Sequence, residues 1–164
     1  MNVLMVEPGK APYETQIGDD LQSMQALVGG YIQAVYPFEQ PVALVCCESG
    51  KLDGLPLNRA LRDADGDIYD IVAGNFFIVG LGESDFTDLP HELAERFAEQ
   101  FRQPEMFMRV DGKIVAAPKL TANNPTNPYS SHMFPFRFFP KFFYKSSFPA
   151  KIKQNRGTAR KKKA

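Results

Sequence analysis

Formal charge is divided unevenly along this chain of 164 residues, and that division separates it into two segments with different physical properties. Residues 1–118 contain all nineteen acidic residues and eight of the nineteen basic ones, which gives this segment a formal charge of −11. Residues 119–164 contain the other eleven basic residues and no acidic residue, so their charge is +11. The total of zero therefore conceals two segments of opposite charge, which we expect to have different roles.

The sequence pattern changes at the same place as the charge, which predicts a domain boundary. The chain has 44% apolar and 23% charged residues, as globular proteins do, and it is long enough to bury a core. Residues 119–132 are rich in turn-forming residues and predict a linker. Residues 133–164 join eight aromatic residues to a basic end, and prolines interrupt any helix there. We therefore expect a compact acidic domain over 1–118, followed by a linker and a disordered basic tail.

Several features favour a cytoplasmic protein without a transmembrane segment. No apolar stretch approaches the roughly 18 residues needed to cross a bilayer. The first residues lack the charged and apolar regions of a signal peptide. Cys46 and Cys47 are the only cysteines, and neighbours on a strand point to opposite faces, so an ordinary disulfide between them is strained. We interpret both as core side chains in a reducing compartment.

The first half of the chain predicts strands around one helix. An amphipathic stripe of apolar residues follows Asp19 and Asp20, which favour a helix N-terminus, and it ends at Gly29-Gly30. The flanking segments are rich in β-forming residues and separated by turn residues. The expected strands are residues 2–6, 12–17, 31–38 and 42–48.

The second half predicts one long helix between further strands. Asp88 is the expected N-cap of this helix, which ends at Gln103-Pro104 and carries a buried stripe of Leu93, Phe97 and Phe101. Asp111-Gly112 is typical of a type I′ hairpin turn. The other expectations are one or two helical turns over 55–61, an acidic turn over 63–67, a single strand interrupted or bent at Gly74 over 68–79, and the hairpin over 106–117.

Because strands often follow strands in this order, βαβ alternation is weak. The pattern therefore predicts an α+β fold with a small, mostly antiparallel sheet of about seven strands and two main helices. A disordered or irregular basic tail is expected to follow it.

Four segments resemble, in order, a domain family of unknown function with the number 3846, which occurs in phages and bacterial mobile elements. They are Val6-Glu7-Pro8-Gly9, Leu27-Val28-Gly29-Gly30-Tyr31-Ile32, Gly54-Leu55-Pro56-Leu57-Asn58-Arg59-Ala60 and Ile71-Val72-Ala73-Gly74-Asn75-Phe76-Phe77-Ile78. The resemblance covers residues 1 to about 118 and implies a mobile-element origin. It implies no particular chemistry, and it does not extend to the tail.

The acidic domain offers little catalytic or metal-binding chemistry. Its only histidine, His91, is expected on the surface of a helix, and no nucleophile elbow or phosphate-binding loop is present. The spacing of Asp63, Asp65 and Asp67 imitates a calcium loop, but Ile68 replaces the required glycine and Asn75 the final glutamate. We therefore predict no catalytic residue, no metal site and no cofactor, and a non-enzymatic protein.

Three residues of the acidic domain are the predicted ligand-binding positions: Asn58, Arg59 and Tyr31. A planar guanidinium can bind a phosphate or carboxylate through two hydrogen bonds. The alternative is that Asn58 caps or ties the loop and Arg59 pairs with one of the nearby aspartates. An enzyme would require these residues and an acid to gather in one pocket.

The basic tail leaves several roles open. Its cations can contact phosphates and its aromatic residues can stack on unpaired bases. It could also bind an anionic membrane surface, fold back on the acidic domain, or have no selected role. The predicted nucleic-acid-binding residues are Lys151, Lys153, Arg156, Arg160, Lys161, Lys162 and Lys163.

Two functional hypotheses follow. The first is a non-enzymatic binding module of a phage or mobile genetic element, whose acidic domain engages a host protein or a small ligand; a basic protein partner suits this charge. The second is a nucleic-acid-binding protein that acts through its tail.

Overall fold

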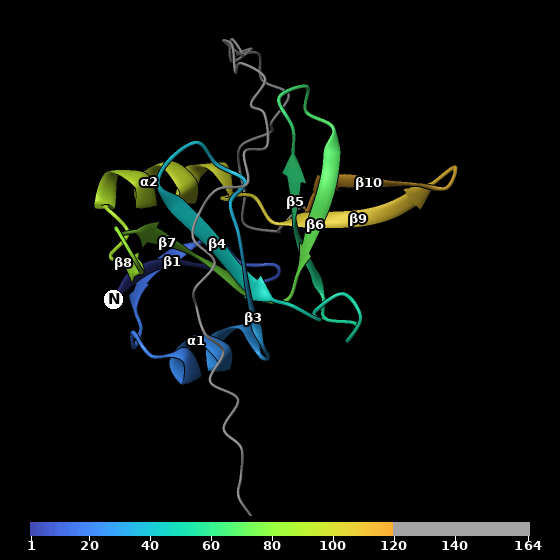
Figure 1. Ribbon diagram of the computed structural model, residues 1–164. Helices are drawn as coiled ribbons and strands as arrows, with labels where there is room; N and C mark the ends of the chain where they lie inside the picture. The colour runs from blue at the N-terminus through green and yellow to red at the C-terminus, as the bar shows by residue number, and fades with distance from the viewer. Residues whose placement is uncertain (120–164) are drawn as a thin grey trace, which may run out of the picture. The chain divides into compact units, whose positions relative to one another are not determined.

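A computed structural model describes residues 1–119 of the protein. The predicted linker and tail lie outside the described residues, except for Lys119. The described part has an α+β fold with antiparallel sheets and two helices, as predicted (Figure 1). The helices are α1 (Leu21–Val28) and α2 (His91–Gln100). The strands are β1 (Asn2–Val6), β2 (Tyr13–Gln16), β3 (Ile32–Val35), β4 (Val42–Cys47), β5 (Leu57–Arg62), β6 (Ile68–Ala73), β7 (Phe76–Leu81), β8 (Phe86–Thr87), β9 (Glu105–Val110) and β10 (Lys113–Pro118).

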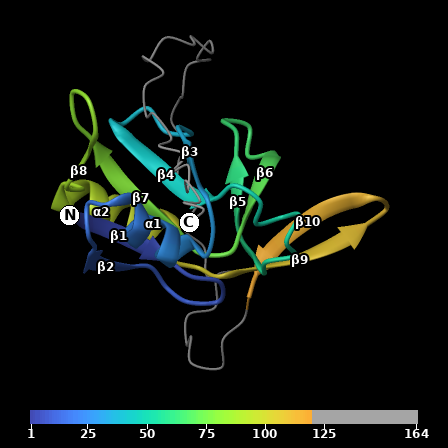
Figure 2. The ribbon, with the colours of Figure 1, turned by 60° about the horizontal axis from the view of Figure 1, so that its bottom comes forward.

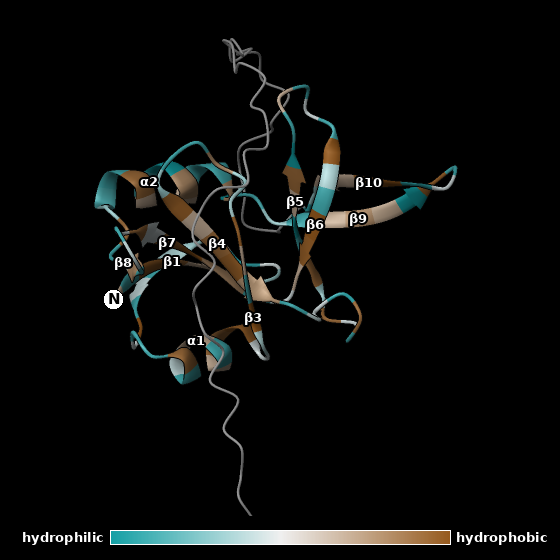
Figure 3. Cartoon of the chain, viewed as in Figure 1, coloured by the Kyte–Doolittle hydropathy of each residue, from teal (hydrophilic) through white to brown (hydrophobic). Residues whose placement is uncertain are grey.

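The centre of the fold is an antiparallel sheet in the order β2-β1-β7-β4-β3, and β8 pairs with β7. The inner strands β1, β4 and β7 are almost wholly buried, and successive side chains alternate between the two faces. Both faces are covered, so these strands are continuous apolar runs. In Figure 3, β4 is coloured as hydrophobic along most of its length, whereas much of α2 is hydrophilic.

Each face of the central sheet contributes to a separate part of the core. On one face, Leu44 and Ile78 pack with Phe97 and Phe101 at α2 and with Leu61 and Val72 of the β5–β6 hairpin. On the other face, side chains including Val45 and Phe77 pack against Met24 and Val28 of α1. The sheet is therefore covered by α1 on one side, and by α2 and a hairpin on the other.

The limits of α1 agree with the sequence analysis. The Asp20 side chain accepts a hydrogen bond from the backbone N of Ser23 at 2.9 Å, which makes Asp20 the N-cap. Gly29 adopts a left-handed conformation with φ of 79°, and its N–H donates to the carbonyl oxygen of Gln25 at 2.9 Å.

The predicted N-cap of α2 is wrong. Pro90, not Asp88, occupies the N-cap position, and no side chain caps this helix. The Asp88 carboxylate instead accepts a hydrogen bond from the backbone N of Asn2 at 2.6 Å. Asp88 therefore ties the start of β1 to the segment before α2, a contact between residues far apart in the sequence. The polar side chains on the outer side of α2 and just after it, including Glu92, Glu95 and Arg102, are exposed.

The predicted helical turns over residues 55–61 are also wrong, because this segment forms β5. It pairs with β6 in an antiparallel hairpin, with a register shift between Leu57 and Arg59. Four consecutive residues of β5, Asn58 to Leu61, are buried. Contacts with distant parts of the chain therefore determine this strand, against the weak local preference of Leu-Asn-Arg-Ala-Leu for β structure. The acidic turn predicted over residues 63–67 connects β5 to β6.

The segment predicted as one strand interrupted or bent at Gly74 is divided there into two strands, which lie in different sheets. β6 pairs with β5, whereas β7 lies in the middle of the central sheet. Gly74 separates them with φ of 77°, and a Cβ at this position would lie 2.6 Å from a methyl carbon of Leu55. Only glycine meets both conditions at low energetic cost.

The β9–β10 hairpin has the predicted turn. Asp111 and Gly112 have φ values of 49° and 79°, as a type I′ turn requires. Figure 2 shows this hairpin projecting beside the β5–β6 hairpin. Within residues 1–119, neither helix is long and apolar enough to cross a membrane.

Candidate functional site

Asn58 and Arg59 lie inside the protein, where β5 meets the central sheet and the end of α2. Their exposed fractions are 0% and 1%. The Asn58 side-chain amide donates to the carbonyl oxygens of Val6 at 3.0 Å and Gly74 at 2.8 Å. Asn58 therefore joins the end of β1 to the junction between β6 and β7, and these partners lie outside the loop that the structural alternative expected it to tie.

The guanidinium of Arg59 makes five hydrogen bonds within the protein. Its Nε and one terminal nitrogen donate to the carbonyl oxygen of Phe101 at 3.0 and 2.9 Å. The same terminal nitrogen donates to the carbonyl oxygen of Lys10 at 2.7 Å. The other donates to the carbonyl and side-chain oxygens of Asn58 at 3.1 and 2.9 Å. The number of these hydrogen bonds equals the number of N–H donors on an arginine side chain, which is five.

These contacts give Arg59 a structural role. It does not pair with an aspartate, as the structural alternative had suggested, but binds the carbonyl oxygen at the C-cap of α2 and that of a loop after β1. Burial lowers the pKa of Arg59, and the nearby Glu105 carboxylate opposes that shift. An arginine remains charged even so. The ligand-binding role of Asn58 and Arg59 stays a prediction. In this geometry their side-chain N–H groups already donate to partners within the protein.

Tyr31, the third predicted ligand-binding residue, lies apart from this buried pair. Its side chain is 72% exposed, and its carbonyl oxygen accepts a hydrogen bond from the N–H of Glu48 at 2.8 Å. This bond extends the β3–β4 ladder by one pair beyond β3. The structure therefore does not bring the three predicted residues together in one pocket.

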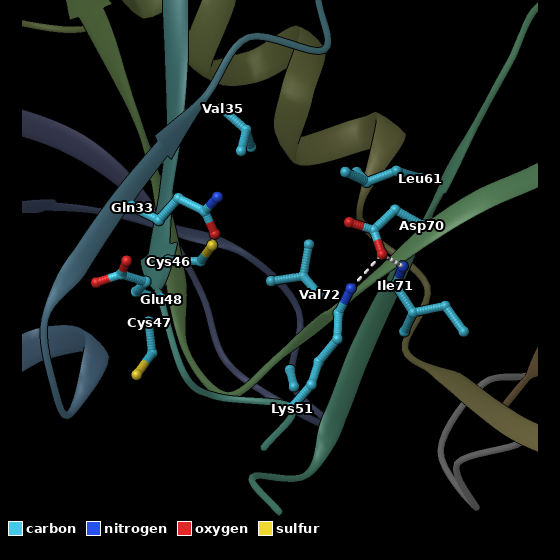
Figure 4. Close-up of a pocket in the computed structure, with 11 residues that line it drawn as sticks. Gln33, Val35, Cys46, Cys47, Glu48, Lys51, Leu61, Asp70, Ile71 and Val72 are labelled. Atoms are coloured by element: carbon cyan, nitrogen blue, oxygen red, sulfur yellow. Dashed lines mark hydrogen bonds and ion pairs between the residues drawn. The ribbon is translucent and has the colours of Figure 1, made fainter. Parts of the chain in front are cut away.

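A small pocket of about 120 Å³ lies between the β3–β4 ladder and β6 (Figure 4). Figure 4 shows Gln33 and Cys46 on one side of it, and Val72 and Asp70 on the other. None of the three predicted ligand-binding residues lines it. Its lining residues are Gln33, Val35, Cys46, Cys47, Glu48, Lys51, Leu61, Asp70, Ile71, Val72 and Ala73.

The polar groups of the pocket have a slight excess of negative charge. Lys51 forms an ion pair with Asp70, and no ion pair involves Glu48 within residues 1–119. Burial, and then the neighbouring Cys47, raise the pKa of the Cys46 thiol to about 11. At neutral pH this thiol is protonated, so it is a poor nucleophile and a poor metal ligand. The pocket can therefore accept a polar or basic group, and Cys46 does not supply it with an activated nucleophile.

No motif in the sequence groups the polar residues of the pocket, which are Gln33, Glu48, Lys51 and Asp70. They come from β3, from the loop that follows β4 and from β6, which are separated in the sequence. One partial signal was available, since alternation along a strand puts Tyr31, Gln33 and Val35 on the same face. The position of β6 over that face carries no local sequence signal.

The acidic turn between β5 and β6 is held by its own backbone. The Asp63 carboxylate accepts hydrogen bonds from the backbone N of Asp65 at 3.0 Å and of Asp67 at 2.9 Å. Such bonds are typical of aspartate in turns. In the described part of the chain, no three acidic, histidine or cysteine side chains are grouped so that they could hold a metal ion.

His91 lies on the surface at the start of α2, among carboxylates. Its Nδ1 is 3.0 Å from a carboxylate oxygen of Glu14, and its Nε2 is 3.6 Å from one of Glu95. The hydrogen bond and charge of Glu14, and then the charges of Glu95 and Glu92, raise the pKa of His91. The imidazole therefore binds a proton more readily than a free histidine does.

We expect an NMR titration of the full chain to give His91 a pKa above that of an unperturbed histidine, with Glu14→Gln lowering it. Because the pKa is raised in the folded state, the associated stabilisation is present below the unfolded-state pKa of about 6.5 and is lost as pH rises through the folded-state value. Glu83→Gln, which removes another exposed carboxylate, is the matched control. An unchanged His91 pKa in Glu14→Gln would contradict the assignment.

The predicted nucleic-acid-binding residues, Lys151, Lys153, Arg156, Arg160, Lys161, Lys162 and Lys163, lie outside the described residues.

Comparison with known proteins gives one match. A family model described as Domain of unknown function (DUF3846) matches residues 1–102. This segment includes the central sheet, both helices and the β5–β6 hairpin, and it ends before β9. No curated protein and no solved structure matches the chain.

Proposed function

The chain belongs to the DUF3846 domain family, and we propose that it is a non-enzymatic binding module of a phage or another mobile genetic element. In this proposal its acidic domain engages a basic host protein. The family supports the mobile-element origin only through the resemblance described above. The charge of the described residues and the small size of the pocket support the choice of a basic protein as the partner.

The distribution of carboxylates carries the proposal. Six of the nineteen carboxylates form ion pairs within residues 1–119, and two of those six pair only with His91. The thirteen others have exposed side chains. They are Asp19, Asp20, Glu39, Glu48, Asp53, Asp63, Asp65, Asp67, Glu83, Asp85, Asp88, Glu92 and Asp111.

The cations of the acidic domain do little to offset these carboxylates. Arg59 is buried, and four others pair with carboxylates: Lys10 with Glu7, Lys51 with Asp70, Arg62 with Glu105, and Arg102 with Glu99. The three remaining cations, Arg96, Arg109 and Lys113, form no ion pair within residues 1–119, and the thirteen carboxylates outnumber them. A surface with this excess of one charge steers partners of the opposite charge toward it and speeds their association.

The pocket favours a protein partner over a small ligand. Pockets that enclose small ligands measure about 300–1,000 Å³, whereas this one measures about 120 Å³. It suits the end of one side chain better than a whole metabolite.

The proposal predicts that the full chain binds a basic peptide in a salt-dependent way. The probe is a fluorescein-labelled ten-residue peptide that alternates lysine and threonine, followed by fluorescence anisotropy. We expect the affinity to fall about tenfold or more as salt rises from low ionic strength to 1 M, where the screening length shrinks to about 3 Å. A peptide with glutamine in place of lysine is the control and should not bind.

The alternative, nucleic-acid binding through the tail, stays a prediction. A variant with glutamine at Lys161, Lys162 and Lys163 separates the two functions. Under the proposal it binds the lysine peptide at least as well as the wild type. If the lysine peptide does not bind at low salt, while a single-stranded oligonucleotide binds and is lost in this variant, the alternative replaces the proposal.

A further inference from the structure

The β3 strand is a free edge of the central sheet. It ends the strand order β2-β1-β7-β4-β3, and within residues 1–119 no strand pairs with its outer side. The N–H of Glu48 donates to the carbonyl oxygen of Tyr31, and the register then pairs Gln33 with Cys46. Hydrogen-bonded pairs alternate along an antiparallel ladder. The backbone N–H and C=O groups of Ile32 and Ala34 therefore point away from β4.

The free edge borders the pocket. Gln33 and Val35 line the pocket, and Tyr31 lies on the same face of the strand by alternation. Ile32 and Ala34 point to the opposite face, where they pack against the α1 side of the core. An added strand would place alternate side chains on the pocket face, one strand spacing of about 4.8 Å beyond β3. A lysine or arginine side chain is long enough to reach back across that spacing.

The chemistry at this edge selects for a basic, extended segment. Glu48 is exposed at one end of the strand, and Glu39 is exposed in the loop after it. Two carboxylates line the pocket, Glu48 and Asp70, against one ammonium group, Lys51. Tyr31 and Tyr36 flank β3 and are 72% and 61% exposed. Aromatic rings so placed can pack on the aliphatic part of a lysine or arginine and attract its charge.

We propose that the basic partner binds by adding a strand to the free edge of β3, with a lysine or arginine side chain seated over the pocket between Glu48 and Asp70. This inference rests on the proposed function and names the surface through which it acts. Backbone hydrogen bonds to Ile32 and Ala34 supply affinity, and the pocket beside Gln33 and Cys46 supplies selectivity for a basic residue.

The first test removes one outward-pointing backbone donor. In Ala34→Pro the missing N–H is one that faces away from β4, a position at which an edge strand accepts proline. We expect about a tenfold loss of affinity for the lysine–threonine peptide, with the salt dependence retained. Ala34→Val keeps the N–H and is the matched control, so it should bind like the wild type. Equal affinities of the two variants would overturn the edge-strand proposal.

The second test places the change in the peptide, so that it does not depend on how Ala34→Pro folds. One peptide carries N-methyl groups on its lysine amides and the other on its threonine amides. A peptide paired along one edge points alternate amides at β3, so one set of methyl groups should block binding and the other should not. Equal affinities would show that only charge holds the peptide, and would overturn the proposal.

The third test concerns the pocket. Glu48→Gln and Asp111→Asn each remove one exposed carboxylate, but Asp111 lies at the tip of the β9–β10 hairpin. We expect Glu48→Gln to weaken peptide binding about threefold and Asp111→Asn to leave it unchanged. Equal losses would overturn the location. In all three tests, salt-dependent binding that none of these substitutions or methyl groups alters would overturn only this inference. If the lysine–threonine peptide does not bind at all, the proposed function is overturned.

Discussion

Replacing Arg59 by alanine is expected to lower the free energy of unfolding of the full chain by about 3–5 kcal/mol. The substitution removes five donors at once. The carbonyl oxygens of Phe101, Lys10 and Asn58 and the side-chain oxygen of Asn58 then lose these bonds. Each buried polar group left without a partner costs about 1–3 kcal/mol, less where water enters the space. Urea unfolding followed by circular dichroism measures the change.

Arg102→Ala is the matched control for this prediction. Arg102 is an exposed arginine that pairs with the exposed Glu99, so its loss should change stability by less than about 0.5 kcal/mol. Arg59→Lys keeps the positive charge but has three donors in place of five, and it should fall between Arg59→Ala and the wild type. A loss below about 1 kcal/mol in Arg59→Ala would contradict the structural role given to this residue.

Replacing Phe97 by alanine should cost a similar amount, about 3–5 kcal/mol, for a different reason. Phe97 is 1% exposed, and its ring centroid lies 4.5 Å from that of Phe38. It is the largest side chain that α2 itself buries against the central sheet. Its removal loses the free energy of burial and leaves a cavity that the surrounding strands cannot fill. Urea unfolding gives the free energy, and near-ultraviolet circular dichroism reports the aromatic packing.

Leu52→Ala is the control for Phe97→Ala, because it also shortens a large apolar side chain. Leu52 is 92% exposed, so its truncation should change stability by less than about 0.5 kcal/mol. If Phe97→Ala were as mild as Leu52→Ala, α2 would not be packed on the sheet in solution as described.

The segment over residues 54–60 is one of the four that resemble the family, and the contacts of Arg59 give this segment a structural role. Asn58 and Arg59 fasten β5 to the ends of β1 and α2. β5 in turn pairs with β6, which supplies Asp70 and Val72 to the wall of the pocket. The segment therefore positions one wall of the candidate site. This structural role is a sufficient reason for the burial of Asn58 and Arg59.

Local sequence signals predicted several elements correctly. Asp20 and Gly29 define the two ends of α1, because each satisfies backbone groups of the helix within a few residues. Asp111-Gly112 defines the β9–β10 turn for the same kind of reason, since the left-handed conformation of both residues is a local property. β3 and β4 lie within two segments predicted as strands, and the short connection between them suits their antiparallel pairing.

Local signals failed where a distant contact determines the structure. The β5 segment has little preference for a strand, and it becomes one because Asn58 and Arg59 bond to carbonyl groups of Val6, Lys10 and Phe101. Asp88 resembled a helix cap, but its carboxylate binds the backbone of Asn2. The pocket was not predicted because its residues meet only after β6 has packed across the β3–β4 ladder.

The sequence by itself determined the opposite charges of the two segments, the α+β class and the ends of those elements that are limited by capping and turn residues. Each of these depends on composition or on contacts within a few residues, which can be recognised along the chain. Only the tertiary structure decided that Arg59 is a buried structural residue, that Gly74 divides two sheets, and that the pocket borders the free edge of β3. These depend on hydrogen bonds and packing between residues about 16 to 52 positions apart, as the Asn58 contacts illustrate. At such separations the partner of a polar group is determined by the fold as a whole.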